Sequence, residues 1–91
     1  MSKVELLKLT VDKVASGTVS SITGIVPLLE SRGIVENMHV GQPKEFFSTD
    51  EEIAEWYLGQ YISIINQESW FAMNSLINQS GAWVESKLNS M

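Results

Sequence analysis

Cysteine is absent from this chain of 91 residues, which excludes disulfide bonds and thiolate ligands for a structural metal. Basic residues are scarce as well, with six against eleven acidic residues and a net charge of −5. Because six scattered cations form no clustered basic footprint, we expect no direct binding to nucleic acid. A chain of this length makes one domain, here 1–91, that buries only about 60% of its unfolded surface. Small proteins without covalent staples often gain stability by forming oligomers.

Charge is nearly absent from the last third of the chain, where Glu68 is the one charged residue between Tyr57 and Val84. Two windows of sixteen residues, Val14–Leu29 and Ser69–Val84, carry no charge at all. Both are shorter than the roughly 20 apolar residues of a membrane span and contain many Ser, Thr, Asn or Gln, so we expect no membrane insertion. The start of the chain shows no secretory signal pattern, and a cytoplasmic protein is expected.

Hydrophobic periodicity predicts helices in the first third of the chain. Apolar residues recur every three or four positions, which is typical of one face of an amphipathic helix. Glycine weakens a helix and proline removes a backbone donor, so Gly17 and Pro27 are expected to disturb this pattern. We predict one helix over about 3–16 and a second over about 20–31.

Gly33 and the β-branched residues of 18–26 give further predictions for the first third of the chain. Gly33 lies where a helix C-terminal glycine is favoured, and an irregular connection over about 32–48 is expected to follow it. The β-branched residues of 18–26 could instead form a strand. The alternative fold is therefore α+β, with a short hairpin within 7–26.

The second half of the chain predicts further helices. Thr49 can cap a helix with Glu52 reaching back to it, and acidic residues favour the positive end of a helix. The following segment is apolar over more than half its circumference, which indicates burial between two layers. Whether this helix ends near Asn66 or continues stays open. Gly81 is the expected break before a last helix over 82–88, and the fold class is an all-α bundle of three to five helices.

The residue types that perform catalysis form no recognisable pattern. The acids near 50–55 lack the central glycine of a calcium loop and have no histidine at the spacing of carboxylate metal helices. His39, the single histidine, has no serine, threonine or carboxylate in a catalytic arrangement with it. The glycines form no phosphate-binding or dinucleotide-binding loop. We therefore expect no enzymatic activity, no metal and no cofactor.

Aromatic residues and amides dominate the charge-poor region. Trp and Tyr are enriched at binding hot spots, and buried amides need hydrogen bonds, so this composition favours a hydrated protein interface. The candidate interface consists of Trp70, Phe71, Asn74, Ile77 and Trp83. The candidate acidic contact surface for a basic partner consists of Asp50, Glu51, Glu52 and Glu55.

These features favour a non-catalytic, self-associating protein-binding module, a small accessory regulator or inhibitor of a larger protein. One alternative is a sensor or enzyme that binds a small ligand in an aromatic pocket between Trp56, Tyr61 and Trp70. The other alternative is a structural subunit of a ring or filament.

Overall fold

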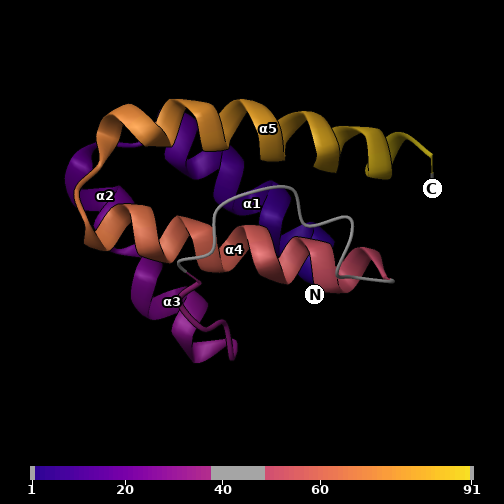
Figure 1. Ribbon diagram of the computed structural model, residues 1–91, viewed down its shortest axis with the longest axis horizontal. Coiled ribbons are helices and arrows are strands. Elements are labelled where there is room, and N and C mark those ends of the chain that lie inside the picture. The colour runs from indigo at the N-terminus through magenta and orange to yellow at the C-terminus, as the bar shows by residue number, and fades with distance from the viewer. Residues whose placement is uncertain (1, 38–48, 91) are drawn as a thin grey trace.

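Five α-helices make up the fold in the computed structural model, which describes residues 2–37 and 49–90 (Figure 1). They are α1 (Lys3–Ser16), α2 (Val19–Thr23), α3 (Ile25–Ser31), α4 (Asp50–Asn66) and α5 (Trp70–Asn89). The described residues contain no strand, so the predicted all-α class is confirmed and the α+β alternative is wrong. Within the β-branched run of 18–26, residues 19–23 and 25–26 are helical, because helix capping and tertiary packing outweigh the weak strand preference of the run.

The first helix ends where the sequence predicts. Gly17 is extended, with φ −88° and ψ 164°, and a Cβ atom there would lie 2.6 Å from the carbonyl oxygen of Lys13. Thr18 then caps α2, because its Oγ1 accepts a hydrogen bond of 3.3 Å from the backbone N–H of Ser21. The chain therefore starts a new helix in a new direction directly after Gly17.

The predicted second helix over 20–31 is two short helices that meet at Gly24. Pro27 lies in the first turn of α3, where a backbone N–H has no helical partner and its loss costs little. Proline is thus accommodated by restarting the helix at Ile25.

The end of α3 confirms the prediction for Gly33, which has a positive φ of 81°. Its N–H bonds to the carbonyl of Glu30 at 3.0 Å, and the N–H of Ile34 bonds to the carbonyl of Leu29 at 3.0 Å. This pair of bonds is the Schellman motif, and Leu29 and Ile34, whose side chains such a motif commonly brings together, are both buried in the hydrophobic core cluster. Residues 34–37 then lie against α4, with a hydrogen bond of 3.1 Å from Asn37 N–H to the carbonyl of Gly59. The rest of the predicted connection, including His39, lies outside the described residues.

The predicted cap of α4 is confirmed. The Oγ1 of Thr49 accepts a hydrogen bond of 3.2 Å from Glu52 N–H and donates one of 3.0 Å to the Glu52 carboxylate. This helix packs against α1, α3 and α5, as its broad apolar circumference predicts.

The prediction of a break at Gly81 is wrong, because α5 runs through it without interruption. The chain turns instead at 67–69, where Glu68 has a positive φ of 55°. Glu68 N–H bonds to Ile65 O and Ser69 N–H bonds to Ile64 O, both at 3.1 Å, so a glutamate holds the position that glycine favours in a Schellman motif. Gly81 faces α1, where an added Cβ atom would lie 3.5 Å from Val11 Cγ1.

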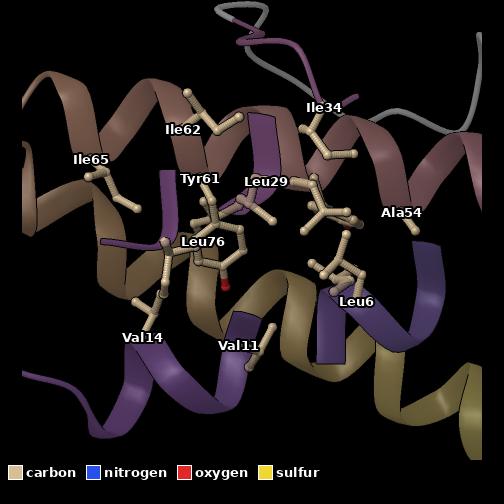
Figure 2. Close-up of a cluster of buried hydrophobic side chains, with 14 of the residues drawn as sticks. Leu6, Val11, Val14, Leu29, Ile34, Ala54, Tyr61, Ile62, Ile65 and Leu76 are labelled. Carbon is tan, nitrogen blue, oxygen red and sulfur yellow. The ribbon is translucent and has the colours of Figure 1, made fainter. Parts of the chain in front are cut away.

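The core lies where α1, α4 and α5 pack against one another. Tyr61 is fully buried near the centre of the cluster in Figure 2, among aliphatic side chains of several helices. The Tyr61 hydroxyl lies 2.8 Å from Ser80 Oγ. The Ser80 hydroxyl in turn donates a hydrogen bond to the carbonyl of Leu76. The bundle thus joins α4 to α5 by one buried polar contact within an apolar core.

Candidate interaction surfaces

One face of α5 is exposed along the whole helix. Nine residues of α5 are exposed, and helical spacing places them on one side, opposite the buried Met73, Leu76, Ser80 and Val84. We name them the outer face of α5: Phe71, Asn74, Ser75, Asn78, Gln79, Ala82, Glu85, Ser86 and Asn89. Glu85 is the one charged residue among the nine, whereas three of the six exposed residues of α1 carry a charge.

Phe71 is the most exposed large hydrophobic residue described, with 92% of its surface accessible. A phenylalanine in water loses the free energy that its burial would contribute, about 1.5–3 kcal/mol. It lies in the first turn of α5, at one end of the outer face. The amides of Asn74 and Asn78 follow it one and two turns later, and both are exposed.

The structure divides the five candidate interface residues into two groups. Phe71 and Asn74 lie together on the outer face. The other three, Trp70, Ile77 and Trp83, are half-buried and pack against the core. Sequence reasoning missed Ala82 and Glu85, which complete the stripe that begins at Phe71. The signal for them was the spacing of three and four residues from Phe71 through Asn74 and Asn78.

Trp83 takes part in an aromatic contact between helices. Its ring lies 5.7 Å from that of Tyr57, and Tyr57 lies 5.3 Å from Trp56 in an edge-on arrangement. Lys87 Nζ lies 5.8 Å from the centroid of the Trp83 ring. These contacts join α5 to α4 and give Trp83 a role in packing.

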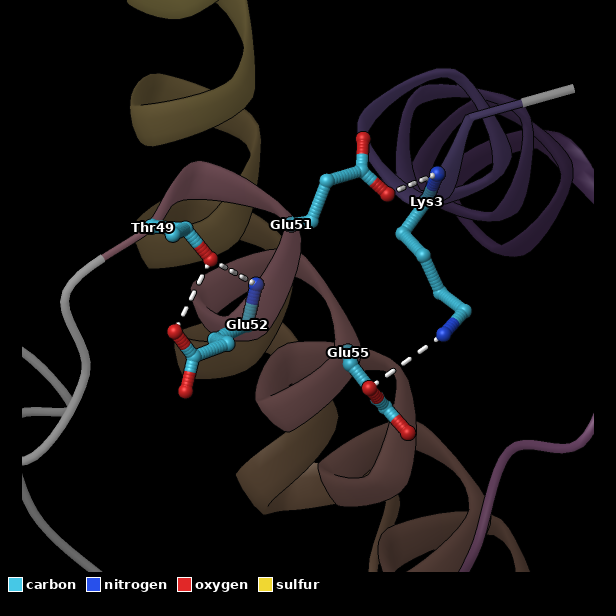
Figure 3. Close-up of polar contacts among 5 residues, drawn as sticks. All are labelled: Lys3, Thr49, Glu51, Glu52 and Glu55. Atoms are coloured by element: carbon cyan, nitrogen blue, oxygen red, sulfur yellow. Dashed lines mark hydrogen bonds and ion pairs between the residues drawn. The ribbon is translucent and has the colours of Figure 1, made fainter.

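The four candidate acidic contact residues lie at the start of α4, and each has a partner within the chain. Figure 3 shows Glu51 accepting a hydrogen bond of 2.9 Å from the backbone N–H of Lys3, and Glu55 paired with Lys3 Nζ at 3.2 Å. Asp50 pairs with Lys87 Nζ at 3.4 Å, and Glu52 bonds to Thr49. These contacts bring the starts of α1 and α4 and the end of α5 together at one end of the bundle.

A hollow of about 290 Å³ adjoins this acidic end. Its lining comes from the 35–37 segment and from α4, and consists of Val35, Glu36, Asn37, Glu52, Glu55 and Trp56. Of the three aromatic residues in the predicted pocket, Trp56 lines this hollow, whereas Tyr61 is fully buried in the core. The hollow therefore differs from the pocket that the sequence predicts.

Within residues 2–37 and 49–90, no three Asp, Glu or His side chains lie close enough together to hold a metal ion. Over the same residues, no helix has the length and apolar character needed to span a membrane. Among the described groups, Tyr61 has the strongest pKa shift, because burial raises its pKa to about 12 and keeps the phenol neutral.

Comparisons of the chain with protein-family models, with curated proteins and with solved structures found no match. The fold and its surfaces thus define a class, a small all-α bundle in which one exposed helix face carries a single charged residue.

Proposed function

We propose that this protein is a non-catalytic, self-associating protein-binding module, a small regulator or inhibitor of a larger protein. The observation that carries the proposal is Phe71, which is 92% exposed on a helix face that bears one charge among nine residues. Apolar and amide side chains without charge are typical of the centre of an interface, from which charged residues are depleted. A second copy of the chain covers Phe71 and lets the exposed amides share hydrogen bonds.

Sedimentation measured across a wide concentration range tests self-association. We expect the average mass of the wild-type protein to rise with concentration. We expect Phe71→Ser to weaken association at least tenfold, because it removes the one large apolar side chain that is exposed on this face. Val35→Ser is the matched control, because Val35 is also highly exposed, at 75%, but lies outside α5. Both variants are expected to fold normally, since exposed substitutions usually change stability by less than about 0.5 kcal/mol. A wild-type protein that stays monomeric at the highest concentrations contradicts the proposal.

The acidic start of α4 is the proposed contact for a basic partner. Four of the eleven acidic residues of the chain stand within six positions there, and the chain as a whole carries a net charge of −5. Electrostatic attraction of this kind raises the rate of association with a positively charged surface.

A decalysine peptide serves as the probe for this surface. We expect the triple variant Glu51→Gln, Glu52→Gln, Glu55→Gln to bind it at least fivefold more weakly than a control with the same net charge. The control carries Asp12→Asn, Glu30→Gln and Glu68→Gln, which neutralise exposed acids outside α4. Equal affinities for the two variants would show that net charge alone governs binding and would reject the contact at α4.

Ligand binding in the hollow beside Trp56 is the second candidate function, favoured by its volume of about 290 Å³. If the hollow binds a ligand, we expect a metabolite to quench the tryptophan fluorescence saturably. We expect this quenching to disappear in the Trp56→Phe variant. No quenching across the metabolite set counts against it.

A further inference from the structure

Residues 34–37 cross α4 at Gly59, where the two backbones nearly touch. A Cβ atom at Gly59 would lie 2.6 Å from the carbonyl oxygen of Val35 and 3.3 Å from the backbone nitrogen of Asn37. No side chain fits into the first of these distances. The segment can therefore approach α4 this closely only because the helix carries a glycine at the crossing.

Two hydrogen bonds among the described residues fasten the crossing, and one apolar side chain anchors its start. The N–H of Asn37 donates to the carbonyl of Gly59 at 3.1 Å, and the side-chain amide of Gln60 donates to the carbonyl of Asn37. Ile34 is 3% exposed, and Figure 2 shows its side chain within the cluster of buried side chains. The two residues between these points are exposed. The segment is therefore fastened at both of its ends.

The hollow beside Trp56 owes its shape to this crossing. Glu52, Glu55 and Trp56 line it from α4, and residues 35–37 form another part of its wall. All three side chains lie on the same side of the helix as Gly59, which follows Trp56 by three residues and Glu52 by seven. The segment thus lies on the backbone of α4 at Gly59 and is separated from the helix by the hollow one to two turns earlier.

We propose that residues 34–37 act as a latch that closes this hollow and opens while the helices stay folded. The latch buries one apolar side chain, that of Ile34, and segments with few buried apolar contacts open at a lower free energy than the rest of a fold. The Schellman motif fixes the chain as far as the N–H of Ile34, so the latch turns about that residue.

Opening the latch removes the part of the wall that residues 35–37 form. A molecule that contacts both α4 and the latch therefore binds only the closed form and stabilises it. The latch gives ligand binding in the hollow, the second candidate function, a conformational gate. It is independent of the proposed self-association.

Native-state hydrogen exchange tests the latch, because the Asn37 N–H is bonded to Gly59 only in the closed form. In the wild-type protein, we expect this amide to exchange more slowly than in an unstructured peptide but at least tenfold faster than amides in the middle of α4. In Gly59→Ala, we expect its exchange to approach that of the unstructured peptide while α5 stays protected. Gly81→Ala is the matched control, since its added Cβ atom would make an ordinary contact of 3.5 Å.

Gln60→Ala is a milder variant that suits helix formation, because alanine has the highest helix propensity. Loss of the hydrogen bond from Gln60 to the Asn37 carbonyl is expected to speed exchange of the Asn37 amide about two- to tenfold. Gln79→Ala removes an exposed amide from α5 and is expected to leave that exchange unchanged.

Acrylamide quenching of tryptophan fluorescence measures how far the latch covers Trp56, which lines the hollow. We expect Gly59→Ala to raise the quenching constant when Trp56 is present. We expect no increase in a Trp56→Phe background, where Trp70 and Trp83 alone report. Equal increases in the two backgrounds would show a general loosening of the bundle and would overturn the gate.

An Asn37 amide that exchanges as fast in the wild-type protein as in an unstructured peptide overturns the closed latch. Exchange of this amide at the rate of the middle of α4 overturns its separate opening. Unchanged exchange in both Gly59→Ala and Gln60→Ala overturns the fastening to α4. None of these results depends on Phe71, which lies on α5, so the failure of the latch and the failure of self-association are distinguishable.

Discussion

At the scale of single residues, Tyr61 couples the core to pH. Its phenol is fully buried between helices, with the hydroxyl 2.8 Å from Ser80 Oγ. Burial raises its pKa to about 12 from the ordinary value of 10.0, because an ionised phenolate has no water around it. The hydrogen bond with Ser80 opposes this shift but is the smaller effect.

Stability is therefore expected to fall at alkaline pH. The raised pKa stabilises the folded protein fully below about pH 10, where both states keep the proton, and this contribution is lost as pH rises from 10 towards 12. Its size is on the order of 2–3 kcal/mol, at about 1.36 kcal/mol per unit of pKa. Burial raises the pKa of Tyr57 too, which adds a loss in the same direction.

Urea unfolding between pH 8 and 11.5 measures this dependence. We expect Tyr61→Phe to lose about 1 kcal/mol at pH 8 through the missing hydrogen bond, and to decline less steeply above pH 10. An alkaline slope equal to that of the wild-type protein would place the titration on another group.

At the scale of helices, two glycines inside helices have opposite surroundings. A Cβ atom at Gly59 would lie 2.6 Å from the carbonyl oxygen of Val35 and 2.8 Å from Asn37 Cβ, so α4 needs glycine there. A Cβ atom at Gly81 would make an ordinary contact of 3.5 Å with Val11 Cγ1. Substitution at Gly59 therefore tests close packing, whereas substitution at Gly81 tests helix propensity.

We expect Gly59→Ala to destabilise the fold by more than about 1 kcal/mol, because the 35–37 segment must shift away from α4. We expect Gly81→Ala to be neutral or to stabilise α5 by up to about 1 kcal/mol, because alanine has the higher helix propensity. Thermal unfolding of both variants provides the comparison. Destabilisation by Gly81→Ala would show that α1 and α5 pack more tightly than this contact indicates.

Signals between neighbouring residues predicted much of the fold. Thr49 and Gly33 marked helix ends because caps depend on side chains and backbone within a few residues. The pattern Ser2 to Glu5 forms a capping box that sequence reasoning overlooked, although its serine and glutamate have the expected spacing. The turn at 67–69 contains neither glycine nor proline, and Glu68 adopts a positive φ because packing of α4 on α5 requires the reversal there. Sequence preference therefore predicted the helix break at Gly81 instead of at 67–69.

The candidate surface was harder to predict because exposure on α5 depends on which side of the helix meets α1 and α4. Aromatic and apolar residues lie on several sides of this helix, and no band of charge marks its outer side. Phe71 and Trp83 consequently looked alike in sequence. In the structure, the first is 92% exposed and the second packs beside Tyr57.

At the scale of the whole molecule, the helices bury unequal amounts of apolar surface. The three long helices α1, α4 and α5 pack against one another, whereas α2 and α3 together contribute Ile22, Ile25 and Leu29 to the buried core. Both short helices have fewer than eight residues. Regions with few buried apolar contacts open at a lower free energy than the rest of a fold.

Native-state hydrogen exchange is expected to show this difference. Amides in the middle of α1, α4 and α5 should exchange only through global unfolding, and those of α2 and α3 through a smaller opening. Ile22→Ala should increase the difference between the free energy of global unfolding and that of opening α2 and α3, since it removes apolar contacts from the short helices. Exchange of α2 and α3 at the global free energy would show that all five helices unfold as one unit.

The helices α4 and α5 run in opposite directions, so the acidic start of α4 lies far from Phe71, beside the other end of α5 (Figure 1). Phe71 and Lys87, the partner of Asp50, are sixteen residues apart on α5, about 24 Å at a rise of about 1.5 Å per residue. A basic partner bound at the acidic end would therefore leave Phe71 accessible at the other end. One molecule would then bind two partners at once without competition between them.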